Sequence, residues 1–484
     1  MSDIDVRLEE IKRRIKYGAC EVIGIGRSNY PLIDMLIKSN AKKITVRDGN
    51  AASLDREKQA HYTALGVDFR LGENYLDGLC GGDEKNTVIF RTPAIRPDKK
   101  EFSDAVGHGA ILSSEMELFL MITPTVSFGI TGSDGKTTTT TLIYKFLSGD
   151  HRAFVGGNIG APLLPELDVM TKDDFSVLEL SSFQLMDISV SPDVAVITNI
   201  SPNHLNWHID MAEYTEAKMR IFSKEQGCRR LVINADCKAL VSAVERKEPD
   251  IEIFAFSSSK HSFSEVSAST ALDVSAAIYI NDNGVIVFDN GKNCVPVLPS
   301  DVVKLPGRHN LENYMAAIGA TYGYVNNDII IKTASEFGGV EHRLEFVREL
   351  DGVKYYNSSI DSSPTRTAAA LSALNKKPII ICGGSDKHIP FAPLAESLCK
   401  MAKAVVLTGE AGPKIKAALL DCDLLADSGL VLIENPSFEG AVKAARSLAG
   451  NGDIVLLSPA CASFDAFKNF EERGKTFKNI VNGF

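Results

Sequence analysis

The sequence predicts three tandem α/β domains, each built on a parallel sheet, and three observations support this fold class. The chain has 484 residues, which is too long for a single hydrophobic core. Short apolar segments alternate with helical segments along most of its length, as they do in doubly wound sheets. Glycine-rich turns at 24–29 and 132–137 follow apolar segments and precede helices. We place the domains at 1–124, 125–338 and 339–484.

The composition is ordinary for a globular protein and excludes several classes of function. A formal net charge of −10 argues against general nucleic-acid binding, which requires a basic surface. The first 18 residues mix acidic and basic side chains, unlike a signal peptide, and no apolar run approaches the roughly 20 residues that span a bilayer. The nine cysteines stand singly, without a C-x-x-C pair, as in a reducing cytoplasm. We expect a cytoplasmic protein with no nucleic-acid or membrane partner, and we take it to be a monomer.

The first domain opens with "CEVIGIGRSNYPLIDMLIKSNAKKITVRDGN", which predicts a strand, a helix and a second strand ending at Asp48. The turn from Gly24 to Asn29 resembles a dinucleotide-binding fingerprint, although Asn29 stands where the third glycine is expected. A tight turn between strand and helix explains this pattern equally well. In either case, the free N–H groups and the dipole of the helix start would favour a diphosphate. With further strands in "NTVIFRTPAI" and "AILSSEM", the domain is predicted to be Rossmann-like.

The second domain begins with the strand "TVSFGI" and the loop "TGSDGKTTTTT". Gly132 and Gly135 would let several backbone N–H groups face one phosphate, Lys136 adds positive charge, and the Thr137 hydroxyl can bind Mg²⁺. The first glycine of the usual G-x-x-x-x-G-K-[ST] spacing is missing. The strand before the loop and the helix after it nevertheless predict a phosphate-binding loop in a domain like those of the P-loop NTPases. The later threonines, 138–141, are expected to contact backbone or to pack.

Beyond this loop, the second and third domains show different strand patterns. In the second domain, "FSVLELSS", "DVAVITNI" and "RRLVINAD" predict buried parallel strands, whereas "AAIYINDNGVIVFDNGKNCVPVLP" predicts a small antiparallel sheet with Asn-Gly turns. In the third, "EHRLEFVRELDGVKYYN" predicts a hairpin with an Asp-Gly turn. The strands "KPIIICGG", "AKAVVLTG" and "DIVLLSPA" then alternate with helices, which predicts a second Rossmann-like domain.

Three further side chains are candidates for a metal shell in the second domain. Glu179 ends one predicted strand, His204 follows another, and Lys218 lies on a helix. Taken singly, each has an ordinary explanation as a solvated strand end, a capping residue and a surface charge. The carboxyl ends of parallel strands meet at one crevice, however. Beside a phosphate loop, these side chains therefore predict a Mg²⁺–ATP site.

Stretches in all three domains together resemble the Mur ligases, the ATP-dependent amide-forming enzymes that build the peptide of bacterial cell-wall precursors. The stretches are "GITGSDGKTTTTTL", "VGGNIGAPLL", "LELSSFQL", "EAKMRIF", "LPGRHNLENYMAA", "EHRLEFV" and "LLSPACASFDAFKNFEERGKTF". The last is similar to the branch of the family that adds D-glutamate. The resemblance implies ligation of D-glutamate to UDP-N-acetylmuramoyl-L-alanine, with ATP and two Mg²⁺ ions.

The resemblance also implies a role for residues of each domain. Those expected to bind the UDP substrate are Gly26, Ser28, Asp48, Asn158, Ser181 and His204. Those expected to bind ATP are Gly132, Ser133, Asp134, Gly135, Lys136, Thr137, Thr138, Asn310, Asn313, Arg343 and Asp361. Those expected to bind D-glutamate are Ser362, Lys387, Ser463, Phe464 and Phe470. The expected metal ligands are Thr137, Glu179, His204 and Lys218, and the catalytic residues are Lys136, Glu179, His204 and Lys218.

Three further positions either match a modified residue of the family or depart from the family pattern. Lys218 matches a lysine that is carbamylated in the family, which would replace its positive charge by a metal-binding anion. Ser358 stands where the family pattern has an acidic residue near the ribose, and Asp361, three places later, is expected to substitute for it. Asn203 precedes His204 where an aspartate is common.

The implied reaction follows from the weak acylating power of a carboxylate. The alanine carboxylate of the substrate would first attack the γ-phosphate of ATP and form an acyl phosphate. The D-glutamate amine would then attack the activated carbonyl, and phosphate would leave.

Two alternatives remain open at this point, and a third fails on the incomplete fingerprint at Asn29. Other Mur ligases and folylpolyglutamate synthase share the central motifs. A nonenzymatic P-loop regulator would bind nucleotide but would not need Glu179, Lys218 and the "SPACASFD" stretch together. A nicotinamide oxidoreductase would use the first and third domains, but it would leave the phosphate loop without a role.

Overall fold

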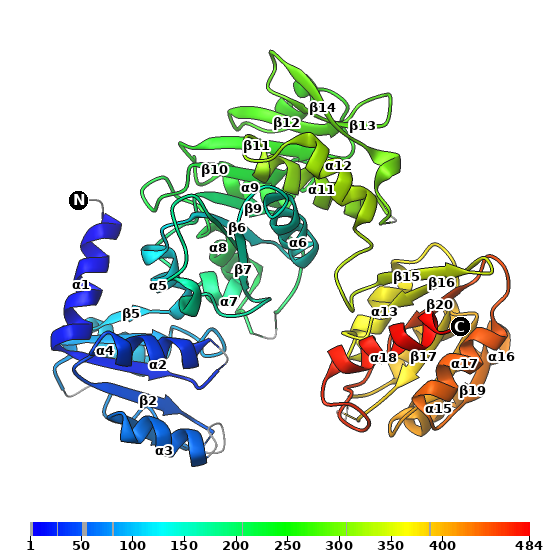
Figure 1. Cartoon of the computed structure of the whole chain (residues 1–484), viewed down its shortest axis with the longest axis horizontal. Helices are drawn as coiled ribbons and strands as arrows, with labels where there is room; N and C mark the ends of the chain where they lie inside the picture. The colour runs from blue at the N-terminus through cyan, green and yellow to red at the C-terminus, as the bar shows by residue number, and fades with distance from the viewer. Residues whose placement is uncertain are drawn as a thin grey trace. The chain divides into compact units, whose positions relative to one another are not determined.

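A computed structural model shows the chain as two compact units, Met1–Ser335 and Glu336–Phe484 (Figure 1). The structure describes residues 3–26, 28–50, 56–79, 82–205, 207–305, 307–386 and 389–484. The first unit contains two sheets and the second contains one. The predicted α/β class with parallel sheets in three domains is confirmed, whereas the predicted domain bounds stay a prediction.

The N-terminal sheet has the strand order β3-β2-β1-β4-β5, and all of its pairings are parallel. Its strands are β1 (Ala19–Ile23), β2 (Ile44–Asp48), β3 (Val67–Leu71), β4 (Thr87–Arg91) and β5 (Ile111–Ser113). The helices of this region are α1 (Asp3–Tyr17), α2 (Asn29–Lys38), α3 (Arg56–Ala64), α4 (Lys100–Gly107), α5 (Glu115–Ile122) and the short η1 (Glu84–Asn86). The predicted strand–helix–strand unit is therefore confirmed as β1, α2 and β2.

The central sheet has nine strands in the order β14-β13-β12-β11-β10-β9-β6-β8-β7. They are β6 (Val126–Thr131), β7 (Ala153–Gly157), β8 (Phe175–Glu179), β9 (Val194–Ile197), β10 (Arg230–Asn234), β11 (Glu252–Ser257), β12 (Val274–Ile280), β13 (Val285–Asp289) and β14 (Cys294–Pro299). The helices are α6 (Lys136–Leu147), α7 (Ser182–Leu185), α8 (Met211–Met219), α9 (Lys238–Glu245), α10 (Phe263–Ser267), α11 (Arg308–Thr321), α12 (Asn327–Glu336), η2 (Leu164–Glu166) and η3 (Ser300–Val302).

The antiparallel strands of the second domain differ from the prediction in one respect. We expected a separate small sheet, but β12 pairs in parallel with β11 and antiparallel with β13. The hairpin strands therefore extend the central sheet instead of forming their own. The physical reason is that β12 has one free edge after pairing with β11, and β13 satisfies the backbone groups along that edge.

The hydrophobic core explains why the first two sheets belong to one unit. β8 and β9 are buried along their whole length, as strands of a parallel sheet covered on both faces should be. A single cluster of buried apolar side chains includes Val22 and Val46 from the N-terminal sheet and Leu178 and Ile197 from the central sheet. The two sheets therefore share a continuous core.

The second unit has a six-stranded sheet in the order β15-β16-β20-β17-β18-β19. Its strands are β15 (Glu345–Leu350), β16 (Val353–Asn357), β17 (Ile379–Gly383), β18 (Ala404–Thr408), β19 (Val431–Glu434) and β20 (Ile454–Leu457). Its helices are α13 (Pro364–Ser372), α14 (Ala392–Met401), α15 (Gly412–Leu420), α16 (Leu425–Ser428), α17 (Phe438–Leu448) and α18 (Phe470–Asn482). β15 and β16 form the predicted hairpin, and Asp351 and Gly352 at its turn have φ of 54° and 73°, as a two-residue turn of this kind requires.

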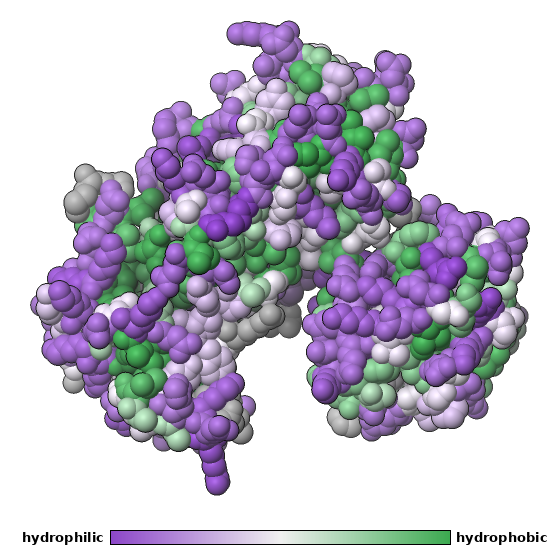
Figure 2. All heavy atoms as spheres, viewed as in Figure 1, coloured by the Kyte–Doolittle hydropathy of each residue, from purple (hydrophilic) through white to green (hydrophobic). Residues whose placement is uncertain are grey.

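Alternate residues of β17 enter different cores. Ile380 and Cys382 belong to one buried cluster, and Ile379 and Ile381 belong to another. Successive side chains of a strand point to opposite faces, so this sheet is covered on both faces. On the side seen in Figure 2, hydrophilic side chains are spread over the surface of each unit, with hydrophobic side chains between them. Within the described residues, no helix is long and apolar enough to cross a membrane.

Two glutamates on α5 have opposite environments although both are buried. Glu117 accepts hydrogen bonds from Ser113 Oγ at 2.6 Å, from Ser189 N at 2.9 Å and from Arg7 at 3.1 Å. Glu115 has a buried Oε1 without a hydrogen-bond partner among the residues that the structure describes. Burial raises the pKa of Glu115 to about 7. Because the folded state holds this proton more tightly than the unfolded chain does, Glu115 lowers stability as pH rises from about 4.5 to about 7.

Glu115→Gln should therefore stabilise the first unit at high pH and change little at low pH. The difference in the free energy of unfolding should approach about 3 kcal/mol near pH 8 and become small near pH 4, below the ordinary pKa of 4.5. Urea unfolding at both pH values measures it. As a matched control, Glu117→Gln should destabilise the unit at both, because it disturbs hydrogen bonds that are made. A Glu115→Gln variant with the pH dependence of the parent would contradict this account.

Candidate functional site

The loop between β6 and α6 requires glycine at two positions. Gly132 and Gly135 have φ of 146° and 78°, which side chains with a Cβ rarely adopt. A Cβ on Gly132 would also lie 1.9 Å from Thr198 Oγ1, and one on Gly135 would lie 2.3 Å from Asn313 Oδ1. The chain can therefore make this turn, with its backbone close to neighbouring elements, only with glycine.

Hydrogen bonds within the protein tie the loop to neighbouring elements. Lys136 Nζ donates to the carbonyl oxygens of Gly132 and Ser133, both at 2.9 Å. Ser133 Oγ lies 2.9 Å from Tyr214 Oη, and Asp134 N donates to Asn199 Oδ1 at 2.9 Å. The loop is thus tied to α8 and to the segment after β9, so the positions of its backbone N–H groups are fixed in advance.

The threonines after the loop have separate roles. Thr137 is buried at the first turn of α6, close to the loop. Thr139 Oγ1 lies 3.2 Å from Asn313 Oδ1, and Thr141 Oγ1 donates to the Thr137 carbonyl at 2.7 Å. Thr139 and Thr141 therefore make the hydrogen bonds predicted for the later threonines, whereas the buried hydroxyl of Thr140 has no partner among the described residues.

Glu179 presents a carboxylate oxygen that fits a cation. It ends β8 beside the loop and is only 2% exposed. Its Oε1 accepts a hydrogen bond from Asn158 Nδ2 at 2.8 Å, whereas its buried Oε2 has no partner within the described ranges. Such an unsatisfied buried oxygen is costly unless something binds it. Among the described side chains, no three of histidine, cysteine, aspartate and glutamate gather as a metal cluster.

Lys218 lies against the phosphate loop and is 1% exposed. Its Nζ donates to the Gly132 carbonyl at 2.8 Å and to Thr131 Oγ1 at 3.2 Å, and it lies 4.7 Å from the centre of the Tyr214 ring. Burial lowers the pKa of Lys218 well below its ordinary value, and the neighbouring Lys136 lowers it further. An ammonium at this position is therefore disfavoured by both its surroundings and its neighbour.

His204 lies in the segment after β9 and is exposed. Its φ is 56°, and its N–H donates to Asn203 Oδ1 at 2.9 Å. Its ring packs edge-on against Phe183, with ring centres 5.0 Å apart. Asn203 therefore shapes the backbone of His204 at the position where the resemblance had led us to expect aspartate.

The structure gives Ser181 a capping role. Its hydroxyl accepts from Gln184 N at 3.3 Å, and its own N–H donates to Gln184 Oε1 at 2.9 Å. This reciprocal pair starts α7 directly after Glu179 and Leu180. The predicted contact of Ser181 with substrate stays a prediction.

The predicted UDP-binding residues of the first domain come together at the turn after β1. Asp48 accepts hydrogen bonds from Ile25 N at 2.6 Å and Asn50 N at 2.8 Å. Asn29 is buried and donates to the Gly24 carbonyl at 2.7 Å. The residue that breaks the fingerprint therefore stabilises the turn itself. Gly26 and Ser28 lie in this turn, and the Ser28 side chain makes no capping bond to α2.

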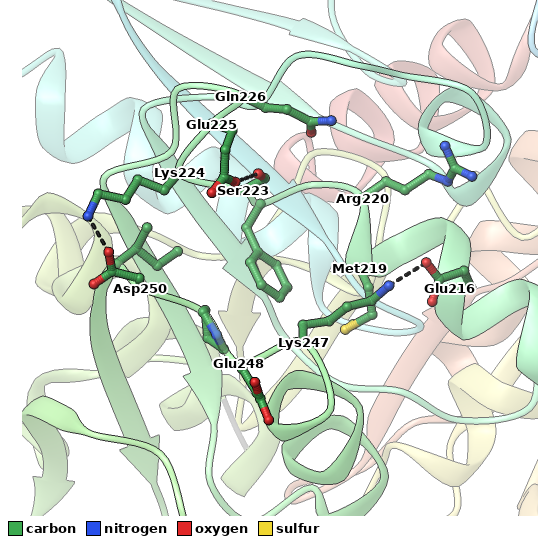
Figure 3. Close-up of a pocket in the computed structure, with 13 residues that line it drawn as sticks. Glu216, Met219, Arg220, Ser223, Lys224, Glu225, Gln226, Lys247, Glu248 and Asp250 are labelled. Atoms are coloured by element: carbon green, nitrogen blue, oxygen red, sulfur yellow. Dashed lines mark hydrogen bonds and ion pairs between the residues drawn. The ribbon is translucent and has the colours of Figure 1, made fainter.

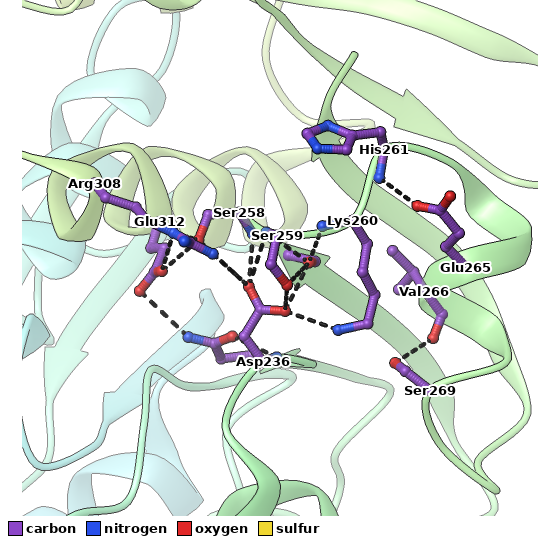
Figure 4. Close-up of polar contacts among 12 residues, drawn as sticks. Asp236, Ser258, Ser259, Lys260, His261, Glu265, Val266, Ser269, Arg308 and Glu312 are labelled. Atoms are coloured by element: carbon purple, nitrogen blue, oxygen red, sulfur yellow. Dashed lines mark hydrogen bonds and ion pairs between the residues drawn. The ribbon is translucent and has the colours of Figure 1, made fainter. Parts of the chain in front are cut away.

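Asn310 and Asn313 lie at the start of α11, next to the phosphate loop. Asn313 Nδ2 donates to Asn310 Oδ1 at 3.3 Å. Figure 4 shows a polar cluster, missed by sequence reasoning, that holds this helix start. Asp236, after β10, accepts from Ser258 N at 2.8 Å, and Glu312 on α11 accepts from Ser258 Oγ at 2.5 Å.

In the second unit, the Asp361 carboxylate is buried. Its Oδ2 accepts from Ser458 Oγ at 2.7 Å, and its N–H donates to the Ser358 carbonyl at 3.0 Å. Burial raises the pKa of Asp361, and hydrogen bonds from the two serine hydroxyls oppose this shift. Arg343 is exposed and forms a short bridge with Val340. The predicted ribose contact of Asp361 stays a prediction.

The predicted D-glutamate residues have different exposures. Ser463 is buried, Phe464 is 73% exposed, and Phe470 begins α18. Ser362 is half-buried, and Lys387 lies outside the described residues. A buried arginine that the prediction missed, Arg473, donates to the carbonyl oxygens at 359, 461 and 462 at 2.9 to 3.1 Å. It fixes two loops that follow strands at the carboxyl edge of this sheet.

A cavity of about 370 Å³ lies apart from these side chains, between the end of α8 with the segment after it and the segment 247–251 that joins α9 to β11 (Figure 3). Ion pairs between Lys224 and Asp250 and between Lys247 and Glu216 lie at its edge. None of the predicted site residues lines it. The candidate site is therefore the edge of the central sheet and not this cavity.

Comparisons with known proteins agree with the geometry. Residues 130–321 match the Mur ligase middle domain, and residues 342–461 match the Mur ligase glutamate ligase domain. The chain is 43% identical over 481 residues to the UDP-N-acetylmuramoylalanine–D-glutamate ligase of Ruminiclostridium cellulolyticum, covering 98% of this chain and 99% of the relative. It is 44% identical over 479 residues to the protein of that name from Clostridium botulinum strain Kyoto, covering 98% of each. The UDP-N-acetylmuramate–alanine ligase of Thermotoga maritima shares the fold, with a TM-score of 0.51 and 17% identity over 96% of this chain and 99% of that one.

Gly132→Ala should abolish the loop geometry because its Cβ would collide with Thr198 Oγ1. We expect the Kd for ATP, measured by calorimetry, to rise at least about tenfold, or ~1.4 kcal/mol. Gly66→Ala is a matched control, since Gly66 has φ of 86° but nothing within 4 Å of a Cβ. It should cost about 1 kcal/mol of stability and leave ATP affinity unchanged. Equal ATP affinity in Gly132→Ala and the parent would show that the loop does not bind phosphate.

Proposed function

The chain belongs to the Mur ligase family, and we propose that it adds D-glutamate to UDP-N-acetylmuramoyl-L-alanine in an ATP-dependent ligation that serves peptidoglycan synthesis. The observation that carries this function is the phosphate loop, with Lys218 and Glu179 packed behind it. A regulator that only binds nucleotide has no need for a buried lysine and for a buried carboxylate with one oxygen unpartnered among the described residues. The two UDP-N-acetylmuramoylalanine–D-glutamate ligases described above match nearly the whole chain. This match supports D-glutamate over other amino acids as the substrate.

We propose a reaction in two steps, in which the phosphate loop binds the phosphate groups. The alanine carboxylate attacks the γ-phosphate of ATP, ADP leaves, and an acyl phosphate forms. The D-glutamate amine then attacks the acyl carbon, phosphate leaves, and the amide remains. The Lys136 ammonium and the N–H groups of the loop bind the phosphates and oppose the negative charge that collects during both steps.

The side chains beside the loop fit Mg²⁺. We assign Thr137, Glu179, His204 and Lys218 as the residues that hold two ions. The unpartnered Glu179 Oε2 supports this assignment, because a carboxylate oxygen is a preferred ligand of Mg²⁺. When bound, Mg²⁺ offsets the charge between the phosphates and the attacking carboxylate.

We assign a carbamate to Lys218. A free ammonium here would be buried beside Lys136 and beside the proposed metal ligands. Addition of carbon dioxide to the uncharged Nζ amine forms an N–C bond and gives a carbamate anion, with loss of one proton. The product carries oxygen ligands at the position where the ammonium would repel a cation.

The remaining assignments follow the predicted domains. Residues 1–124 bind the UDP part of the substrate, 125–338 bind ATP, and 339–484 bind D-glutamate. Asn158 and Ser181 touch the muramoyl-alanine arm. The ATP contacts of Arg343 and Asp361 are part of the same proposal. We further propose that the protein is a monomer and acts in the cytoplasm, where free cysteines such as those of the described residues are usual.

Phosphate release from ATP tests the function directly. The purified protein should release phosphate only when UDP-N-acetylmuramoyl-L-alanine and D-glutamate are both present, and Lys136→Ala should release none under the same conditions. Equal turnover with L-glutamate or L-lysine would refute D-glutamate as the substrate but leave the ligase class standing. Phosphate release without any amino acid would refute the ligation itself.

The proposed carbamate on Lys218 can be tested by substitution. Lys218→Ala should lose nearly all activity without unfolding, and acetate should restore part of it by placing a carboxylate in the vacant space. Lys218→Arg should stay inactive with acetate, since it keeps the charge and forms no comparable carbamate. Steady-state rates and thermal unfolding measure both effects. A Lys218→Arg variant as active as the parent would mean that only a cation is needed.

A further inference from the structure

Arg96 reaches from the loop after β4 of the N-terminal sheet into the central domain. Its NH2 donates to Glu213 Oε1 at 2.7 Å and its NH1 to Glu213 Oε2 at 3.2 Å. NH1 also donates to the Trp207 carbonyl at 2.6 Å, and the guanidinium lies 5.0 Å from the centre of the Trp207 ring. Asp98 accepts from the same guanidinium at 2.8 and 2.9 Å. All of these contacts lie within the first unit.

Glu213 also contacts a buried histidine, His208. Its Oε2 lies 3.1 Å from His208 Nδ1 and accepts from Ile209 N at 3.0 Å. The other ring nitrogen of His208 lies 2.9 Å from Ser182 Oγ, and the ring stacks on Phe183 at 5.6 Å. The hydrogen bonds from Arg96 are the largest cause that lowers the pKa of Glu213 to about 2, so the carboxylate is ionised and available to both partners.

These contacts surround His204. Its carbonyl accepts from Trp207 N and His208 N, both at 3.0 Å, so His204 begins a short turn that Trp207 and His208 end. We call the described residues His204, Leu205, Trp207 and His208 the His204 turn. Its first residue has a backbone φ of 56°, a conformation that the surrounding structure must hold. Arg96, Glu213 and Ser182 hold the end of the turn.

The same contacts connect the elements that carry the other proposed ligands. Glu213 lies on α8, which also carries Lys218, and Ser182 begins α7, directly after Ser181. Arg91 makes a separate link between the N-terminal sheet and the central domain, because its buried guanidinium donates to Asp187 at 2.5 and 3.0 Å. Association of the two sheets therefore does not depend on Arg96.

We propose that Arg96 is a positioning residue for the Mg²⁺ site: through Glu213 and His208 it fixes the His204 turn relative to α8 and α7. The inference rests on the proposed function, because that function assigns His204 and Lys218 to the metal. Arg96 itself has no role in binding phosphate, since its donors are already used by Asp98, Glu213 and Trp207. Outer partners of metal ligands typically set metal affinity and ligand orientation.

The only tryptophan of the chain, Trp207, allows a test that does not need turnover. MgCl₂ would be titrated into the full-length protein with saturating ATP and no UDP substrate, while Trp207 emission is recorded. The parent should show a saturable change in emission. Arg96→Gln should raise the Mg²⁺ concentration at half-saturation about tenfold, and Arg96→Lys should lie between the two, because it keeps the charge but cannot bind Glu213 in two places.

Two further variants separate positioning from stability. Arg152→Gln removes another arginine–carboxylate pair of the same unit, with Asp174 at 3.0 Å, and should leave the Mg²⁺ midpoint unchanged. The double variant Arg96→Gln/Glu213→Gln should be no weaker in Mg²⁺ binding than the more affected single variant, since both remove one interaction. In turnover assays, Arg96→Gln should raise the Mg²⁺ requirement about tenfold and leave the KM for D-glutamate unchanged.

The results that would overturn the proposal are distinct from those that would overturn the function. An unchanged Mg²⁺ midpoint in Arg96→Gln, with a lowered unfolding temperature like that of Arg152→Gln, would make Arg96 a structural residue only. Additive losses in the double variant would refute transmission through Glu213. A parent protein that gives the Mg²⁺-dependent emission change but no D-glutamate-dependent phosphate release would refute the proposed ligation and leave the role of Arg96 standing.

Discussion

The contact between Lys218 and the carbonyl of Gly132 is the constraint around which the candidate site is arranged. It places a fully buried amine directly behind a loop that already carries Lys136. Keeping both amines charged so close together would cost a large amount of free energy. The buried Oε2 of Glu179, which has no hydrogen-bond partner among the described residues, is a second unsatisfied group nearby. Binding of a cation by an anionic form of Lys218 and by Glu179 would resolve both problems together.

The short helix α8 connects this site to its surroundings. Tyr214 contacts the phosphate loop through Ser133, and Lys218 contacts it through Gly132. Glu213, on the same helix, contacts Arg96 from the N-terminal sheet. One helix therefore contacts both the N-terminal domain, through Arg96, and the phosphate loop. A continuous core of buried apolar side chains also joins the two sheets.

Local patterns in the sequence predicted most of the fold and the centre of the site. Parallel strands stand out in the sequence as apolar runs. The phosphate loop is recognisable by Gly132 and Gly135, which occupy positions with positive φ. The extension of the central sheet by β13 was not predictable, since edge pairing is decided by which strand end is free. Arg96 and His208 were missed because their partners are far away in the sequence or depend on tertiary packing; the only local signal was a tryptophan–histidine pair close to His204. Asn29 interrupts the dinucleotide-binding fingerprint, but its buried amide stabilises the turn by donating to the Gly24 carbonyl.

The central claim is that Lys218 is held as an anion. Carbon-13 NMR of the protein equilibrated with ¹³C-bicarbonate tests it most directly, with Lys218→Arg as the reference. We expect the parent to show a carbamate carbon resonance that is absent from Lys218→Arg and that persists when free bicarbonate is removed in the presence of Mg²⁺ and ATP. Identical spectra for the two proteins would contradict the claim and leave Lys218 as an uncharged amine bound to the loop.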